Sequence, residues 1–245
     1  MPNWLSKTAI PLFVSRKRLM RYKRKLPDAI GPWSCDSGAF SELEDNGRFT
    51  ISSNDYAVEV KRYRSHIGNM LWAAPQDWMC EERILKKTGK SIVEHQHLTV
   101  NNYLDLMTAA PTVPWIPVLQ GWSFADYLRC TELYEAAGVS LKSLPLVGLG
   151  SVCRRQNTLM VEQLIVHLHR AGLKLHGFGF KIEGLRRVAS CLTSADSMAW
   201  SYAGRYRACE NGNANCANCF HWATEWREEV MRSIACPFQE NLAYV

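Results

Sequence analysis

Residues 144–180, LPLVGLGSVCRRQNTLMVEQLIVHLHRAGLKLHGFGF, contain the pattern that decides the fold. A short apolar run at 144–149 predicts a buried strand. Apolar residues then dominate 160–171, which predicts a helix that ends at Gly172. A second strand is expected at 173–180. Two short apolar runs separated by a helix of about 10–15 residues are typical of a βαβ unit with parallel strands.

The same alternation continues along the rest of the chain. Further strands are expected at 10–14, 33–39, 70–75, 113–119 and 195–200, with helices at 55–70, 100–109, 124–137, 182–189 and 222–234. No glycine-rich dinucleotide loop is visible, which favours a closed barrel over an open Rossmann sheet. The sequence therefore predicts an α/β protein with a (β/α) TIM-like barrel over residues 1–205. Seven strands rather than eight make that barrel irregular or incomplete.

The composition is that of an ordinary globular protein. Of 245 residues, 47% are hydrophobic and 21% are charged, and no stretch approaches the roughly 18 apolar residues of a membrane span. The N-terminal residues lack the features of a signal peptide. The nine cysteines are odd in number and mostly scattered, which argues against a disulfide framework. We therefore expect an intracellular, cytoplasmic protein.

The formal net charge is +6, and seven lysines and arginines fall between residues 16 and 25. Such a run is more often a solvated surface than a binding site. It nevertheless permits a polyanionic partner, because phosphate backbones are the commonest ligands of basic clusters.

Polar residues or glycines follow the predicted strands at equivalent points. They are Asp36 and Ser37, Gln76 and Asp77, Gln120 and Gly121, Gly148 and Gly150, His176 and Gly177, and Asp196 and Ser197. Each alone could be a helix cap or a turn. Because the active site of a β/α barrel lies at the carboxyl ends of its strands, their recurrence predicts one shared site. Two carboxylates with a glutamine and backbone amides suit a flat, neutral ligand, with one carboxylate as nucleophile and another moving a proton.

Several of these segments resemble the boxes of tRNA-guanine transglycosylases. Residues 36–40, DSGAF, resemble their Asp-Ser-Gly-Gly-Tyr/Phe box, and residues 119–121, LQG, resemble Val-Gln-Gly. Residues 147–150, VGLG, and 175–179, LHGFG, resemble Gly-Gly-Leu-Ala and Leu-Met-Gly-Val-Gly. The order is preserved between residues 33 and 219. This chain is shorter than the usual member, with Ala39 in place of a glycine and His176 in place of a methionine. It is most similar to the short DNA-modifying branch, which places 7-cyano-7-deazaguanine into DNA.

The resemblance implies a role for each matched residue. Asp196 would attack the sugar and hold a covalent glycosyl intermediate, while Asp36 would act as general acid and base. The residues implied to bind the base are Ser37, Phe40, Asp77, Gln120, Gly148, Leu149, His176 and Gly177. Phe40 and His176 would stack on its two faces. The implied partners are DNA and a free 7-deazaguanine base. A tRNA substrate, or a catalytically silent nucleic-acid-binding subunit, are the alternatives.

Four arginines lie on the same predicted face as the carboxylates. We expect Arg154, Arg155, Arg205 and Arg207 to contact phosphates, with a solvated loop as the alternative.

The C-terminal cysteines have the spacing of a metal site. Cys209, Cys216 and Cys219 form a Cys-x6-Cys-x2-Cys pattern, and a Cys-x2-Cys pair lets two thiolates reach one ion. We predict a structural Zn²⁺ in a knuckle that forms a second domain, residues 206–245, together with the C-terminal helix. The fourth ligand is either Cys236, which we favour, or His221. The remaining cysteines, which we expect to be buried thiols, are Cys35, Cys80, Cys130, Cys153 and Cys191.

Overall fold

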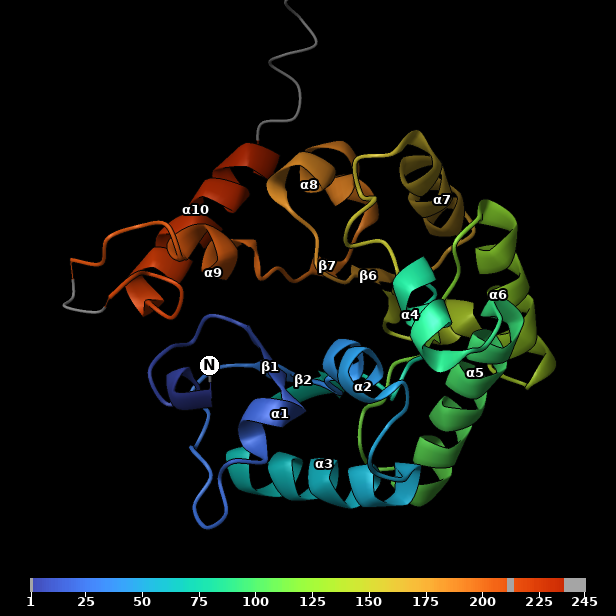
Figure 1. Ribbon diagram of the computed structural model, residues 1–245, viewed down its shortest axis with the longest axis horizontal. Helices are drawn as coiled ribbons and strands as arrows, with labels where there is room; N and C mark the ends of the chain where they lie inside the picture. The colour runs from blue at the N-terminus through green and yellow to red at the C-terminus, as the bar shows by residue number, and fades with distance from the viewer. Residues whose placement is uncertain (1, 211–213, 236–245) are drawn as a thin grey trace, which may run out of the picture. The chain divides into compact units, whose positions relative to one another are not determined.

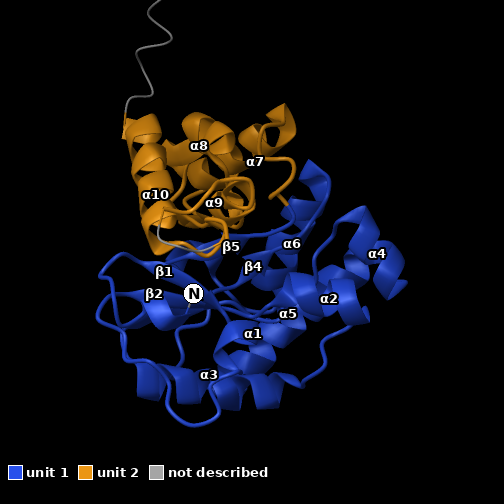
Figure 2. Ribbon diagram, turned by 60° about the vertical axis from the view of Figure 1, so that its left-hand side comes forward, with its two compact units in different colours: residues 1–151 blue, residues 152–245 orange. Residues whose placement is uncertain are grey.

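The computed structural model describes residues 2–210 and 214–235. The chain divides into two compact units, which span residues 1–151 and 152–245 (Figure 2). Each unit combines parallel strands with helices, so the predicted α/β class is confirmed. The closed barrel and the domain boundary at residue 205 remain predictions.

Unit 1 contains five of the strands (Figure 1). The strands β1 (Leu12–Ser15), β2 (Trp33–Asp36) and β3 (Met70–Ala73) form a parallel sheet in that order, and β4 (Val118–Leu119) pairs in parallel with β5 (Val147–Leu149). The α-helices are α1 (Arg16–Leu19), α2 (Ala39–Asn46), α3 (Ser53–Ile67), α4 (Glu82–Thr88), α5 (Ile92–Ala109) and α6 (Phe124–Ala136). Single 3-10 turns lie at Pro2–Trp4 and Leu141–Ser143.

Serine caps fix where the long helices of unit 1 begin. The Ser52 hydroxyl accepts the N–H of Asp55 at the start of α3. Ser91 and Ser123 form capping boxes with the third residue of α5 and of α6. Such caps satisfy N–H groups that the helix itself leaves unpaired. The three helices then pack in sequence, α3 on α5 and α5 on α6, which places them beside the strands that carry the polar residues.

Unit 2 contains the remaining strands and helices. They are α7 (Leu159–Arg170), β6 (Leu175–Gly177), α8 (Ile182–Val188), a 3-10 turn (Ala189–Cys191), β7 (Ser194–Ala195), α9 (Ala199–Gly204) and α10 (Phe220–Ala235). β6 and β7 are parallel, with His176 opposite Ser194 and Gly177 opposite Ala195. α10 packs against α8 and α9.

All seven predicted strands are present in the described residues, but several are shorter than expected. The strand predicted at 113–119 is reduced to residues 118–119. Its prolines at 114 and 117 lack the N–H that a sheet needs. The strand predicted at 195–200 ends at Ala195, and the chain turns into α9 with Met198 as its N-cap. In this turn the Ser197 hydroxyl accepts the N–H of Ala199. Four short helices, α1, α2, α4 and α9, were not predicted from the sequence.

Within the described residues, helices that are both long enough and apolar enough to cross a membrane are absent.

Candidate active site and metal centre

The turn after β2 presents a carboxylate, a hydroxyl and an aromatic ring. Asp36 ends the strand, and its Oδ1 accepts the N–H of Gly38 at 3.1 Å. Gly38 has a φ of +78°, which turns the chain directly into α2. The buried Ser37 hydroxyl has no hydrogen-bond partner among the described residues. Phe40 is 44% exposed, with the Arg83 guanidinium 5.6 Å from its ring centroid. A buried hydroxyl without a partner beside an accessible ring suits a flat polar ligand.

Asp77 and Gln120 form a buried polar pair in unit 1. Asp77 lies in the loop after β3 and Gln120 directly follows β4. The Gln120 Nε2 donates to Asp77 Oδ2 at 2.5 Å. Burial and the nearby Asp36 carboxylate raise the pKa of Asp77 to about 7, although the hydrogen bond from Gln120 opposes that shift. Near neutral pH, Asp77 can therefore both accept and donate a hydrogen bond.

The Ser151 hydroxyl holds the Gln120 amide in place. This residue was not among those predicted from the sequence. Its Oγ lies 2.7 Å from Gln120 Oε1 and 3.1 Å from Glu81 Oε2, and it accepts the N–H of Cys80 at 2.7 Å. A hydroxyl bonded to Oε1 leaves the Gln120 Nε2 facing Asp77. Ser151 has a φ of +54°, which is unusual for a residue with a side chain. A Gly-Ser pair is typical of an ordinary turn, so the local sequence does not predict this contact.

The backbone of β5 is partly used within the sheet. The N–H of Gly148 donates to the Pro117 carbonyl at 2.8 Å, and the N–H of Gly150 donates to the Leu119 carbonyl at 3.0 Å. The Leu149 side chain is buried. The base contacts that the sequence predicts at Gly148 and Leu149 would therefore have to come from other backbone groups, and they remain predictions.

In unit 2, Asp196 directly follows β7, and its carboxylate is hydrogen-bonded by two groups. The His176 Nε2 lies 3.3 Å from Asp196 Oδ1, and the Gly179 N–H donates to the same oxygen at 3.1 Å. The His176 Nδ1 lies 2.8 Å from the Ser194 hydroxyl. The His176 side chain is only 3% exposed, whereas that of Asp196 is 18% exposed. Gly177 ends β6, and its carbonyl accepts the N–H of Asp196 at 3.4 Å.

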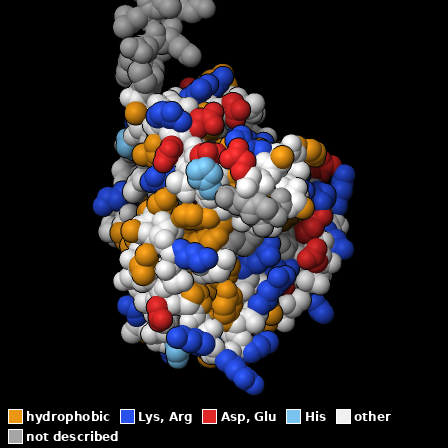
Figure 3. Space-filling model, turned by 90° about the vertical axis from the view of Figure 1, so that its left-hand side faces the viewer, with side chains coloured by type: hydrophobic (Ala, Val, Ile, Leu, Met, Phe, Trp, Pro, Cys, Tyr) orange, Lys and Arg blue, Asp and Glu red, His pale blue; other side chains and the backbone are white. Residues whose placement is uncertain are grey.

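The four predicted phosphate contacts differ in their surroundings. Arg154 is exposed and Arg155 is half-buried in the segment before α7, while Arg205 and Arg207 are exposed after α9. The Arg207 guanidinium lies 4.5 Å from the ring centroid of Trp222, so its side chain packs on α10. Lys and Arg side chains recur across the surface that Figure 3 shows.

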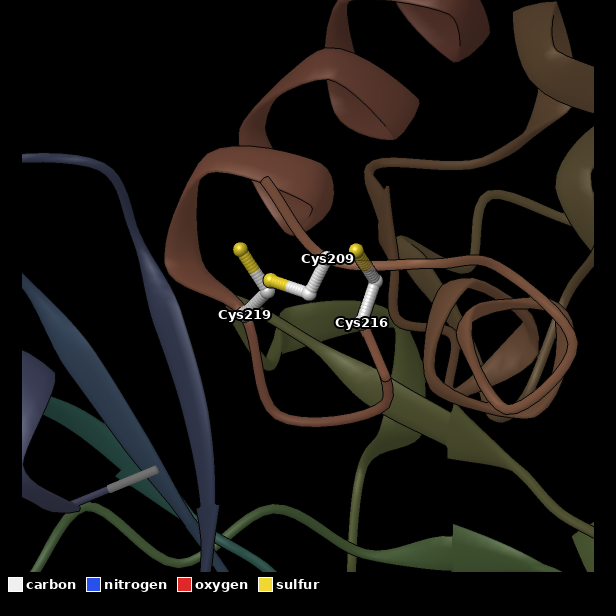
Figure 4. A group of neighbouring side chains, drawn as sticks. All are labelled: Cys209, Cys216 and Cys219. Atoms are coloured by element: carbon white, nitrogen blue, oxygen red, sulfur yellow. The ribbon is translucent and has the colours of Figure 1, made fainter. Parts of the chain in front are cut away.

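Cys209, Cys216 and Cys219 come together as the spacing predicts. Their sulfur atoms all lie within 4.8 Å of one another, next to the first turn of α10 (Figure 4). Gly204 makes this arrangement possible, since a Cβ at that position would lie 2.6 Å from the Cys216 carbonyl. Three thiols at this separation fit one soft metal ion, because thiolates so close together need a cation between them.

The fourth ligand is less defined than the other three. The three cysteines and His221 line one pocket. The His221 ring contacts Glu225, with 3.0 Å between Nε2 and Oε1. It is not part of the close cysteine cluster. Cys236, the other predicted ligand, lies outside the described residues.

Of the remaining cysteines, three are buried as predicted. These three are Cys35, Cys80 and Cys130. The prediction was wrong for the other two, since Cys153 is exposed and Cys191 is half-buried. Both cysteines belong to unit 2 and lie outside its strands. Burial raises the pKa of Cys35, the neighbour of Asp36, which disfavours the thiolate that a nucleophile needs.

Comparison with known proteins assigns the chain to a family. The model of the family DpdA, described as DeoxyPurine in DNA protein A, matches residues 1–242. A search of curated proteins found no match. The matched range contains the carboxylates of both units and the three clustered cysteines. Because this match covers nearly the whole chain, the chain belongs to the DpdA family, whose members have a role in deazapurine modification of DNA.

Proposed function

We propose that this protein is a transglycosylase that exchanges a guanine base in DNA for a 7-deazaguanine, with 7-cyano-7-deazaguanine as the incoming base. Membership of the family supports DNA as the substrate. The observation that carries the base exchange is the buried Asp77–Gln120 pair, on the same unit as the unpartnered Ser37 hydroxyl.

These groups complement the hydrogen-bonding edge of guanine. That edge offers N–H donors at N1 and N2 and an acceptor at O6. The Asp77 carboxylate can accept from the donors. The Gln120 amide carries a second N–H besides the one bonded to Asp77, and it can donate to O6. Phe40, exposed beside Ser37, would stack on the ring. A 7-deazaguanine has the same edge, so the two bases compete for one set of contacts.

The chemistry is assigned to Asp196 and Asp36. In the first step, Asp196 forms a bond to C1′ as the bond from C1′ to guanine N9 breaks, and the departing base takes a proton from the Asp36 carboxylic acid. In the second step, Asp36 accepts the N9 proton of the incoming base, whose nitrogen forms the new bond to C1′. The electron pair of the ester bond returns to Asp196. The target nucleotide must leave the helix to be reached, which costs a few kcal/mol of unstacking.

The clustered cysteines would hold a structural zinc. Cys209, Cys216 and Cys219 supply three thiolates, and His221 or Cys236 would supply the fourth ligand. Such an ion would tie the loop after α9 to the start of α10, and it takes no part in the chemistry. Arg154, Arg155, Arg205 and Arg207 would bind DNA phosphates.

The experiment measures incorporation of labelled 7-cyano-7-deazaguanine into duplex DNA. Asp196→Ala should lower incorporation by at least about 10³-fold, because no group replaces the nucleophile. Glu183→Ala is the matched control, since Glu183 is an exposed carboxylate on α8 of the same unit, and it should retain full activity. Equal incorporation by wild type and Asp196→Ala would remove Asp196 as nucleophile. Turnover of tRNA alone would favour the RNA alternative, and a wild type without any covalent adduct to DNA would favour a silent binding subunit.

A further inference from the structure

The strand pair β6–β7 builds a hydrogen-bonded chain from Ser194 through His176 to Asp196. His176 and Ser194 face each other in the parallel register, which brings the hydroxyl within 2.8 Å of Nδ1. The ring then reaches Asp196 Oδ1 with Nε2 at 3.3 Å. An ionised carboxylate only accepts hydrogen bonds, so Nε2 must carry the proton in this contact. In the neutral ring Nδ1 is then an acceptor, and the Ser194 hydroxyl donates to it.

The two oxygens of Asp196 differ as a result. Oδ1 accepts from the His176 ring and from the Gly179 N–H. No hydrogen bond to Oδ2 occurs within the described part of the chain, and the side chain is 18% exposed. Residue 179 has to be a glycine, because its φ is +70° and a Cβ there would lie 2.6 Å from the Cys153 Sγ. One oxygen is thus held by two donors while the other stays available.

From this geometry we infer that His176 is a positioning residue for Asp196, which directs Oδ2 to the sugar and stabilises the carboxylate when it leaves. The inference rests on the proposed function. Oδ2 forms the bond to C1′, and Oδ1 becomes the carbonyl oxygen of the ester. When the incoming base displaces the ester, the bond between C1′ and Oδ2 breaks and its electron pair returns to the carboxylate. The His176 and Gly179 N–H groups already face the oxygen on which that charge develops.

The hydrogen bonds that Oδ1 accepts have opposite effects on the two steps. They withdraw charge from the attacking carboxylate, which slows formation of the ester. They also make the carboxylate a better leaving group, which speeds its breakdown. Loss of the His176 N–H should therefore slow the second step, whereas in the first step the loss of positioning is partly offset by a more nucleophilic carboxylate. More enzyme should then remain as the covalent adduct.

Two substitutions separate this role from stacking on the base, which the sequence also suggests for His176. His176→Phe keeps a ring and removes the N–H, whereas His176→Gln keeps an N–H and removes the ring. We expect His176→Phe to lower kcat by about 10–100-fold, with an unchanged KM for the free base and a larger trapped fraction of protein–DNA adduct. His176→Gln should recover most of the lost kcat.

Ser194→Ala provides a milder test that keeps the ring. Without the hydroxyl the ring loses its orientation, so we expect kcat to fall by about 3–10-fold with the same rise in adduct. Thermal unfolding of each variant establishes that it is folded. An active His176→Phe with an inactive His176→Gln would overturn the inference in favour of stacking, and equal losses in both folded variants would overturn it too. Failure of the proposed function is distinct, because the wild type itself would then form no adduct with DNA.

Discussion

The polar site of unit 1 and the cysteine cluster of unit 2 are both buried groups of side chains, but different interactions hold them together. Around Gln120, each polar atom of the amide bonds to another side chain, Oε1 to Ser151 and Nε2 to Asp77. In the cysteine cluster, the Cys216 thiol donates to the Ala208 carbonyl at 3.5 Å, and the three sulfurs lie within 4.8 Å of one another. The described residues of this loop, 205–210 and 214–219, bury few apolar side chains.

The difference concerns what each region needs in order to keep its shape. Hydrogen bonds within the chain can hold the first region before any ligand arrives, as a preorganised site requires. Three adjacent thiolates repel one another, and a bound cation would remove that repulsion in the second region. Both regions depend on a glycine for close approach, Gly150 against the Gln120 amide and Gly204 against the Cys216 carbonyl. Substitutions in each region can test this contrast.

Removal of the metal ligands should have the largest effect, and it should be confined to unit 2. We expect Cys219→Ser to reduce bound zinc from about one ion per chain to near zero, as loss of one thiolate from a structural site does. Hydrogen exchange should then speed up in α9 and α10 and stay unchanged in α5. Metal analysis and exchange mass spectrometry measure both effects, with Cys191→Ser as the control thiol outside the cluster. A zinc-free wild type that is fully protected in α10 would contradict the metal dependence.

Gly204→Ala should destabilise the cysteine loop while leaving every thiol in place. The new Cβ would lie 2.6 Å from backbone atoms of Cys216, which cannot move without moving the ligand. We expect a loss of more than about 2 kcal/mol in the free energy of unfolding, together with weaker zinc binding. Denaturant titration measures the first and competition with a chelator the second. Ala203→Ser, at an exposed position of the same helix, is the control.

Gly150→Ala should affect activity more than stability. The added Cβ would collide with the Gln120 amide, which is the end of a side chain and can rotate away. The amide would then lose Asp77 or Ser151, and we expect kcat/KM for base exchange to fall about 10-fold, with a cost of roughly 1 kcal/mol in stability. Steady-state kinetics alongside thermal unfolding test this. A variant with normal KM for the base would remove Gln120 from base recognition.

Asp77→Asn should change how stability depends on pH. The native pKa of Asp77 is raised to about 7, above that of an unfolded aspartate, so the native state binds more protons between about pH 4 and pH 7. The free energy of unfolding of the wild type should therefore fall over this range relative to the asparagine variant, and the difference should level off above it. Urea unfolding at pH 5, 6, 7 and 8 measures it. Parallel curves for the two proteins would show that Asp77 is not perturbed.

The sequence predicted the parallel α/β class and the cysteine cluster because both leave local signals. Apolar runs separated by helical periods are visible in order along the chain, and the spacing of Cys216 and Cys219 describes a knuckle by itself. Residues 195–200 show where such signals fail, because a turn at Ser197 and the start of α9 replace the strand that their apolar character suggested. The hydrogen bonds of Ser151 to Gln120 and to Glu81 were not predicted from the sequence. Glu81 and Ser151 are 70 residues apart, and only the fold brings them together.

The backbone of Ser151 has a φ of +54°, a left-handed conformation that a residue with a side chain rarely adopts. A left-handed conformation costs a residue with a Cβ on the order of 1 kcal/mol, and glycine would relieve it. Ser151→Gly would relieve that strain, but it would also leave the Cys80 N–H and the Gln120 Oε1 without their partner, so the amide could turn over and lose its orientation. The hydrogen bonds of the Ser151 hydroxyl thus offset the cost of its backbone. The identity of this residue in other members of the family should therefore distinguish chains that still exchange bases from chains that have lost the activity and kept the fold.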